Sequence, residues 1–463
     1  MPVRRLLPLT VLLSLVLCAP AGASRSQPLT FEAPRDLMNP ATRPAALEEL
    51  KSLGVRSLRV ILTWRAVAPG ADQAQMPNFD PTDPRGYDWG EYDPLMAAAA
   101  ERGWPVLMTI SGPVPKWATQ AKLDNLTRPS PAAFEAFTTA VGRRYGAQVK
   151  TWAIWNEPNQ PQFLRPQFSR GGRASSPGIY RRLYSAGVRG LNKAGQGTDS
   201  FLLGETSPRG NSRVVAPLQF LRGTLCLNAK YKRIGRCGAL SPNGYAHHAY
   251  TTRQGPAFKP PNSDDVTIGV LSRLTKALDR ARSAGALTRR LPIHLTEFGI
   301  QSLPDRIQGV SLARQVQYRA ISERIAYDNP RVVSFSQYLL TDSDPTGPKQ
   351  YGGFESGLRF ASGRPKPSLA GFRLPIAVRR QGSKVSIWGL VRPTAAIGAY
   401  PGPGATSATI TYSDRGSSRV RTLRRVRTNA LGYFQASASY RAGRRWNVTW
   451  QGQTGSPVSA YTR

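Results

Sequence analysis

The stretch Lys150-Thr-Trp-Ala-Ile-Trp-Asn156 is a run of apolar and strand-forming residues that is followed at once by an acid, Glu157. Short runs of this kind are typical of strands in a parallel sheet, which is buried on both faces. Seven more strand candidates of this kind lie at residues 29–33, 57–64, 105–111, 201–205, 244–250, 292–297 and 332–339.

Helical patterns lie between these strand candidates, at residues 41–53, 89–102, 131–145, 179–194, 217–225, 266–284 and 312–327. Eight alternating units within about 345 residues predict an α/β fold, a (β/α)₈ TIM barrel with enlarged loops. The alternative is a doubly wound open sheet. Such a sheet normally has a glycine-rich phosphate turn after its first strand, and Phe31-Glu-Ala-Pro34 contains no glycine.

The hydrophobic pattern of the sequence changes after Arg373. Short alternating runs at 408–412, 433–440 and 446–450 are separated by Gly, Pro and Ser, which predicts a small all-β sandwich. We therefore expect a barrel domain over residues 24–373 and an accessory domain over residues 376–463. The spacing of Thr428, Gly432 and Phe434 resembles a turn of immunoglobulin-like domains on secreted bacterial proteins.

The N-terminus has the layout of a secretory signal peptide. Two arginines precede the apolar run 6–18, and Ala21-Gly-Ala23 offers a cleavage site, so residues 1–23 are expected to be removed on export. Cys18 would make a lipoprotein the alternative, but Leu17 occupies a position where lipidation needs a small residue. No later tract is apolar for the ~20 residues of a membrane span. The expected location is therefore extracellular, with cell-wall association as an option.

The chain is strongly basic, with 63 Lys and Arg against 27 Asp and Glu and a net charge of +36. From Ile376 onward, 14 Lys and Arg face the single acid Asp414, a balance of +13. Such charge favours anionic partners such as nucleic acid, anionic lipid or anionic cell-wall polymer. Because the arginines are spread along the chain without a nucleic-acid-binding signature, we expect no nucleic-acid partner, and a cell-wall polymer would bind the basic C-terminal domain.

Two carboxylates end strand candidates: Glu157 the fourth and Glu297 the seventh, at the edge where barrel active sites are built. Their motifs, Trp152-Ala-Ile-Trp-Asn-Glu-Pro-Asn159 and Ile293-His-Leu-Thr-Glu-Phe-Gly299, resemble those of clan A glycoside hydrolases, notably family 5 cellulase-like and family 39-like enzymes. The resemblance covers the whole barrel. It implies a secreted retaining β-glycosidase that acts on β-linked oligo- or polysaccharides, without metal or cofactor.

Retaining glycosidases need two carboxyl groups about 5–5.5 Å apart, one protonated and one ionised. The resemblance implies that Glu157 is the acid/base, that Glu297 is the nucleophile and that Asn156 binds the sugar 2-hydroxyl. Strict alternation along a strand would place Asn156 and Glu157 on opposite faces. The strand end must therefore twist or bulge if both are to reach one site.

Further residues match the clan's supporting positions. Arg59, on the second strand candidate, would lower the pKa of Glu297. His248 and Tyr250 share one face of the sixth strand candidate and resemble the clan's His-x-Tyr pair, whereas His247 points the other way and is expected to be structural.

Aromatic side chains are candidate sugar-stacking platforms. Trp64 and Trp117 are placed for this role, although large aromatic residues also belong to cores. Clan members often carry a tryptophan at the end of strand eight. Here Gln337 or Tyr338 must take its place.

Two other function classes remain open from the sequence. One is a non-catalytic protein that binds glycan or cell-wall polymer on a degenerate barrel, which the intact Glu157, Glu297 and Arg59 disfavour. The other is a basic envelope protein that binds an anionic polymer. We also expect the sandwich to be a separable module that raises the local concentration of the barrel on anionic surfaces.

Cys226 and Cys237 are the two cysteines left after removal of the leader, and we predict that they form a disulfide in an oxidising compartment. Thiol titration of the unfolded, unreduced mature chain should find no free sulfhydryl. Two free thiols per chain would contradict the pairing.

Overall fold

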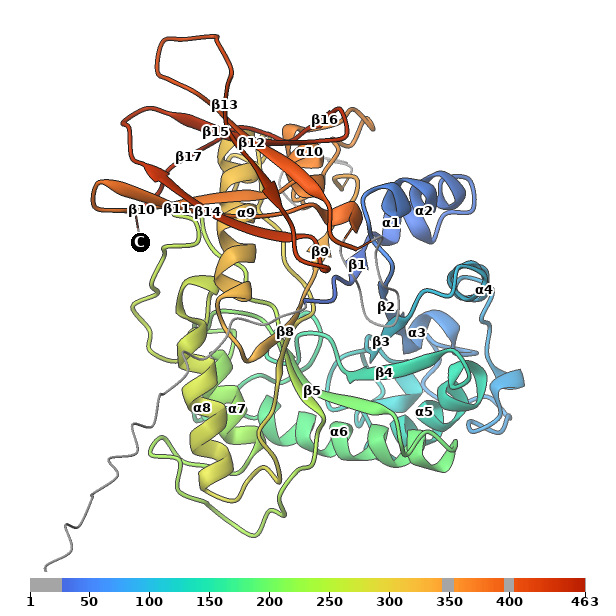
Figure 1. The fold of residues 1–463 in the computed structure, drawn as a ribbon. Helices are drawn as coiled ribbons and strands as arrows, with labels where there is room; N and C mark the ends of the chain where they lie inside the picture. Colours follow the sequence, from blue (N-terminus) through green and yellow to red (C-terminus); the bar gives the residue numbers. More distant parts are fainter. Residues whose placement is uncertain (1–26, 344–353, 395–403, 463) are drawn as a thin grey trace, which may run out of the picture.

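The computed structural model describes residues 27–343, 354–394 and 404–462. The signal peptide expected over residues 1–23 lies outside these ranges. The chain forms a barrel of parallel strands surrounded by helices, followed by antiparallel β-sheets (Figure 1).

The barrel strands are parallel neighbours in the order β8-β7-β6-β5-β4-β3-β2-β1-β9. Their bounds are β1 Phe31–Glu32, β2 Leu58–Thr63, β3 Val106–Ser111, β4 Val149–Ile154, β5 Ser200–Thr206, β6 Gly244–His247, β7 Ile293–Leu295, β8 Val332–Phe335 and β9 Gln337–Tyr338. β8 and β9 are two halves of the eighth strand candidate, interrupted at Ser336. Because β9 pairs with β1, the ring is closed through one interrupted strand. This confirms the predicted barrel and excludes the open sheet.

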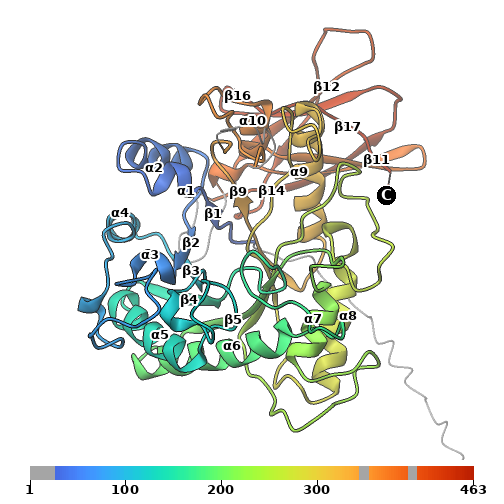
Figure 2. The same cartoon turned by 180° about the vertical axis from the view of Figure 1, so that it is seen from behind.

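Helices alternate with the strands and lie outside them (Figure 2). They are α1 Pro34–Leu37, α2 Arg43–Ser52, α3 Trp64–Val67, α4 Asp93–Glu101, α5 Pro131–Tyr145, α6 Ser176–Lys193, α7 Pro217–Thr224, α8 Leu271–Ser283, α9 Leu312–Tyr327 and α10 Pro367–Arg373. Each of the seven expected helices is present, while the short α1, α3 and α10 were not anticipated. Within the described ranges, no helix is long and apolar enough to cross a membrane.

Capping residues and a glycine explain how helices α5 and α6 pack behind strands β3, β4 and β5. Ser130 caps α5 by accepting a hydrogen bond from the Ala133 amide at 3.3 Å, and Pro131 occupies the first helical position. On α6, a Cβ at Gly190 would collide with the Thr138 hydroxyl of α5, so the close approach of these helices needs glycine. β3 is buried along its whole length. The strands that end at the site are therefore held from behind by tightly packed helices.

The expected disulfide between Cys226 and Cys237 is present in the structure. It closes a loop between α7 and β6, and Arg233 donates a hydrogen bond to the Cys237 carbonyl within this loop. The bond therefore lies at the end of the barrel opposite to the carboxyl ends of the strands.

The C-terminal strands form two antiparallel sheets, which confirms the all-β sandwich. The strands are β10 Ile376–Gln381, β11 Lys384–Leu390, β12 Ser407–Ser413, β13 Arg421–Arg427, β14 Tyr433–Ser439, β15 Arg445–Trp450, β16 Gln453–Thr454 and β17 Val458–Ser459. One sheet has the order β10-β11-β14; the other has the order β13-β12-β15-β16, with β17 paired to β15. Buried side chains such as Ile387, Ile410 and Trp446 fill the space between them.

The sandwich packs against barrel helix α9, which runs beside β10 and β11 (Figure 1). Glu323 of α9 forms a buried ion pair with Arg319 at 3.2 Å and another with Arg392, which follows strand β11, at 2.7 Å. Arg324 of α9 donates to the backbone of β10 and β11. Val316 of α9 belongs to the sandwich core. The helix α9 and the sandwich therefore share part of one interior, and the separability of the sandwich stays a prediction.

We predict that Glu323→Ala lowers the free energy of unfolding by about 3–5 kcal/mol, because it leaves two buried arginines without their carboxylate. Asp72→Ala is the matched control, since it breaks an exposed pair with Arg65 and should cost at most about 1 kcal/mol. Denaturant unfolding of both variants measures the difference. Equal, small losses would show that the interface does not support the fold.

Candidate active site

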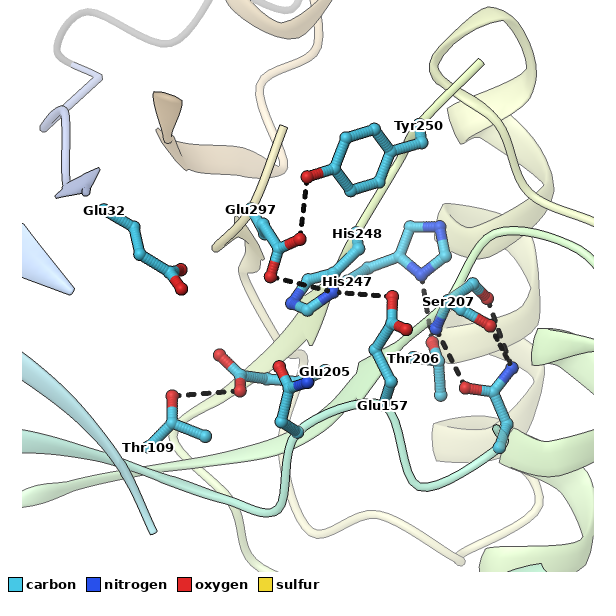
Figure 3. Close-up of polar contacts among 12 residues, drawn as sticks. Glu32, Thr109, Glu157, Glu205, Thr206, Ser207, His247, His248, Tyr250 and Glu297 are labelled. Atoms are coloured by element: carbon cyan, nitrogen blue, oxygen red, sulfur yellow. Dashed lines mark hydrogen bonds and ion pairs between the residues drawn. The ribbon is translucent and has the colours of Figure 1, made fainter. Parts of the chain in front are cut away.

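A cavity of about 790 Å³ opens at the carboxyl ends of the barrel strands. Six of the residues singled out from the sequence line it: Arg59, Asn156, Glu157, Tyr250, Glu297 and Tyr338. A seventh, His248, is buried behind Glu157 and contacts it (Figure 3). The structure therefore gathers side chains that lie on, or directly after, five separate strands into one site.

The backbone at the end of β4 brings Asn156 and Glu157 to the same cavity. The strand stops at Ile154, and both Trp155 (φ 75°) and Glu157 (φ 37°) adopt the left-handed region that residues other than glycine rarely occupy. The Glu157 amide donates to the Glu205 carbonyl at 3.0 Å, which holds this turn against β5. The distortion expected from the sequence is thus present, and both side chains line the cavity.

Glu157 and Glu297 lie on either side of one imidazole nitrogen. Nδ1 of His248 is 2.9 Å from Oε1 of Glu157 and 3.6 Å from Oε2 of Glu297 (Figure 3). These two oxygens cannot lie farther apart than the two distances added together. The two carboxyl groups of inverting glycosidases are roughly 6.5–9.5 Å apart, so this upper limit only just reaches the lower end of their range. The separation of ~5–5.5 Å in retaining glycosidases lies within the limit.

The two carboxyl groups differ in their pKa values. Burial raises the pKa of Glu157. Burial also acts on Glu297, but the charges of His248 and Arg59 and a hydrogen bond from Tyr250 outweigh it, so the pKa of Glu297 lies below its ordinary value. The Tyr250 hydroxyl donates to Oε1 of Glu297 at 2.7 Å. The environment therefore favours a protonated Glu157 beside an ionised Glu297.

Arg59 lies at the centre of the site, and its guanidinium is fully buried. It donates to Oε2 of Glu297 at 3.0 Å, to Oε2 of Glu205 at 2.8 Å and to Oδ1 of Asn156 at 2.8 Å, and it pairs with Glu32. Burial alone would lower the pKa of Arg59, but the surrounding carboxylates raise it well above its ordinary value. Arg59 therefore stays charged and positions both a carboxylate and an amide of the site.

Glu32 and Glu205 are buried acids of the site that were not selected from the sequence. Glu32 ends β1 and lines the cavity. Glu205 lies where the β5–β6 register shifts, at φ 51°, and accepts a hydrogen bond from the Thr109 hydroxyl at 3.0 Å. Both lie at or next to the end of a strand candidate, so the criterion that selected Glu157 and Glu297 would also have found them.

The structure corrects the assignment of the two tryptophans as sugar-stacking platforms. Trp64 begins α3, is fully buried and stacks on Phe137 of α5, with ring centroids 4.9 Å apart. Trp117 is 6% exposed, packs edge-on against Trp64 and donates its indole N–H to the Pro69 carbonyl. Neither lines the cavity. Because β2 runs directly into α3, the Trp64 ring is directed into the helix layer rather than toward the site.

The aromatic side chains that do line the cavity include Tyr250, Tyr338 and Phe354. Tyr338 and Phe354 are perpendicular, with ring centroids 5.1 Å apart. Gln337, the alternative to Tyr338, is buried away from the cavity and accepts a hydrogen bond from Arg319 at 2.8 Å. Phe354 lies in a loop without strand or helix periodicity, so no pattern in the sequence marked it.

His247 is structural, as its position on the opposite face of the strand predicted. Its Nδ1 contacts the Thr206 hydroxyl and its Nε2 the Val266 carbonyl, and burial lowers the pKa of His247 to about 4. Among the residues that the structure describes, no group of three or more His, Cys, Asp or Glu side chains is placed to hold a metal ion.

Solved structures with a similar fold are glycoside hydrolases. A glucosidase from Croceicoccus marinus matches with a TM-score of 0.53 at 12% identity, over 93% of this chain and 98% of its own. A GH39 enzyme from Xanthomonas axonopodis pv. citri matches with 0.50 at 16%, over 93% and 94%. GH5_18 from Streptomyces cattleya, solved in complex with GlcNAc, matches with 0.50 at 15%, over 76% and 79%. The chain shares the fold of these enzymes, a barrel of parallel strands surrounded by helices. No family model and no curated protein sequence matches it.

These matches confirm the fold that the strand-four and strand-seven motifs implied, including a β-sheet domain after the barrel. At 12–16% identity they carry the fold alone, and the chemistry must be argued from the site's own residues.

We predict that Glu32 makes stability depend on pH. Burial raises the pKa of Glu32 from 4.5 to about 7, so between these values the folded state holds a proton that the unfolded chain releases. Stability from this group is therefore lost as the pH rises through about 7. Glu32→Gln should fall less in melting temperature over this window than the wild type. Glu48→Gln, at a carboxylate that is 58% exposed, is the control and should follow the wild type. Identical pH profiles for all three proteins would contradict the assignment.

Proposed function

We propose that the protein is a retaining β-glycosidase that hydrolyses β-linked glycans by double displacement. The observation that carries the proposal is the pair Glu157 and Glu297, which face one imidazole nitrogen and have pKa values shifted in opposite directions. An acid kept protonated beside a carboxylate kept ionised is what this reaction requires.

In the first step, a carboxylate oxygen of Glu297 attacks the anomeric carbon of the sugar bound in the cavity. The bond from that carbon to the leaving oxygen breaks, and Glu157 transfers its proton to this oxygen. Arg59 and Tyr250 hold Glu297 ionised and oriented through hydrogen bonds of 3.0 Å and 2.7 Å. Asn156, fixed by Arg59, is placed to bind the sugar 2-hydroxyl.

In the second step, Glu157 is ionised and acts as a base. It accepts a proton from water, the water oxygen bonds to the anomeric carbon, and Glu297 leaves as a carboxylate. His248 contacts Glu157 at 2.9 Å and Glu297 at 3.6 Å. Its imidazole is therefore positioned to stabilise whichever of the two carries negative charge.

A glycan-binding protein without catalysis is the second candidate from the sequence. Binding alone gives no reason for two carboxyl groups whose pKa values are shifted in opposite directions beside a buried arginine, which is why we favour the enzyme. A hydrolysis screen against chromogenic β-glycosides and β-glucans tests this choice. Release of sugar supports the enzyme, and binding without release supports the alternative.

We further propose that the protein acts outside the cell. The signal-peptide layout of residues 1–23 and the Cys226–Cys237 disulfide support this location. The +13 balance from Ile376 onward would draw the protein to anionic cell-wall polymer, and salt should weaken that attraction.

We predict different outcomes for the two carboxylates. Glu157→Ala should slow hydrolysis of glycosides with poor leaving groups about 10²–10⁴-fold, while an activated aryl glycoside still forms the glycosyl-enzyme. The second step then lacks a base, so azide should restore turnover and give a β-glycosyl azide. Glu297→Ala should abolish the covalent step for every substrate, and azide attack should give the α-anomer.

NMR of the azide products decides between the roles. Anomers reversed between the two variants would exchange the acid/base and the nucleophile. Glu101→Ala, at an exposed carboxylate on α4, is the control and should retain wild-type turnover. Wild-type activity in both Glu157→Ala and Glu297→Ala would place the reaction elsewhere.

A further inference from the structure

A second hollow, of about 1050 Å³, opens beside the catalytic cavity. It is lined mainly by the loop that follows β4, residues 160–168, and by the loop that follows β5, residues 208–214. Three residues, Gln160, Gln162 and Pro208, line both hollows. The second hollow, which we name the arginine groove, is therefore an extension of the cavity rather than a separate site.

The walls of the arginine groove are fixed to each other by Asn159, which is fully buried. Its side-chain amide donates to the Ser207 hydroxyl at 2.9 Å and to the Val215 carbonyl at 2.9 Å, and it accepts from the Ser207 amide at 2.9 Å. The Val266 amide holds the second loop by donating to the Pro208 carbonyl at 2.8 Å. The groove is thus formed before any ligand binds, which lowers the entropic cost of binding.

The charge of the groove is positive. Arg165, Arg209 and Arg213 line it with exposed side chains, and no acidic residue is among its lining residues. In the described part of the chain, none of the three forms an ion pair with a carboxylate. Arg165 donates to the Pro161 carbonyl, and Arg209 lies 6.0 Å from the centre of the Phe258 ring.

Asp265 feels the charge of Arg209 and Asp124 that of Arg165, but in the described part of the chain neither acid forms an ion pair with these arginines, and the hydrogen bonds of both are to other groups. Asp265 is buried beneath the second loop, accepts the Gly210 amide at 2.9 Å, and has a pKa raised by burial. Asp124 accepts hydrogen bonds from the amides of Leu126 and Thr127 and from the Thr127 hydroxyl. The three guanidinium groups therefore remain available to an anionic ligand, and their planar forks suit oxyanions.

The position of the groove identifies the part of the substrate that would occupy it. Glu157 precedes the loop of residues 160–168, and in the proposed function Glu157 protonates the leaving oxygen. The groove therefore extends the leaving-group side of the cavity. Resting on that function, we propose that the arginine groove binds the leaving-group portion of an anionic glycan, whose carboxylate or sulfate groups pair with Arg165, Arg209 and Arg213.

Calorimetric titration of the full chain tests this assignment with three tetrasaccharides: tetragalacturonic acid, polysulfated cellotetraose and neutral cellotetraose. We expect at least one anionic tetramer to bind about tenfold more tightly than the neutral one, as three exposed ion pairs would give, and the preference to weaken with salt. The tighter of the two anionic tetramers identifies the ligand as carboxylated or sulfated. Equal affinities for all three would overturn the proposal.

A matched pair of variants separates the groove from the general basic charge. Arg165→Gln, Arg209→Gln and Arg213→Gln together should abolish the preference for the anionic tetramer. The control removes three exposed arginines near the opposite end of the barrel, Arg236, Arg282 and Arg289, and should keep the preference. Equal losses in both triple variants would overturn the proposal. The single variants Arg209→Gln and Arg213→Gln repeat the test if the groove triple variant melts at a lower temperature.

Binding requires no turnover, so this experiment is independent of hydrolysis. A chain that binds the anionic tetramer through the groove but hydrolyses nothing would refute the proposed function and keep the groove. With an aryl glycoside that is hydrolysed, the anionic tetramer should raise the apparent KM and leave kcat unchanged, because groove and cavity share Gln160 and Gln162. Binding without competition would overturn the placement on the leaving-group side.

Discussion

The buried guanidinium of Arg59 is the interaction on which the site depends. It contacts Glu32, Asn156, Glu205 and Glu297, which come from the ends of strands β1, β4, β5 and β7. A charge without solvent is tolerated only when carboxylates surround it, and those carboxylates in turn need its positive charge. The same contacts act on the pKa values of the site. The charges of His248 and Arg59 hold the pKa of Glu297 below its ordinary value, whereas burial raises the pKa of Glu157, which lacks a direct contact with Arg59.

This arrangement requires local strain in the backbone. Trp155, Glu157 and Glu205 occupy positive φ values just beyond or within the strand ends, each at a cost of about 1–3 kcal/mol. The helices behind them supply the compensation, because α5 and α6 pack at glycine distance and β3 is buried throughout. The packed helices on one side and the charged cluster around Arg59 on the other together stabilise this strained backbone, which neither would stabilise alone.

Much of this could be predicted from the sequence, because strand and helix periodicity marks the barrel and because barrel sites form where strands end. Glu157 and Glu297 followed from that rule, and Arg59 and His248 followed from the resemblance to clan A glycoside hydrolases. Trp64 did not, because the direction of its ring depends on α5, which no local pattern reveals. The interface of α9 was also hidden. Glu323 and Arg324 look like solvent-facing residues, but they are buried and contact Arg392 and the strands β10 and β11.

The closure of the ring between β1 and β9 has a consequence for how the protein assembles. Phe31 and Glu32 pair with Gln337 and Tyr338. The first and last strands of the barrel are therefore neighbours in space, although almost the whole barrel sequence lies between them. Contacts of such long range are slow to form, because closing a long loop costs chain entropy before the contact stabilises it. Glu32 lies on this seam and contacts Arg59, so the electrostatic surroundings of Arg59 are incomplete until the seam closes. A chain in which this seam is still open would therefore lack the complete set of contacts around Arg59.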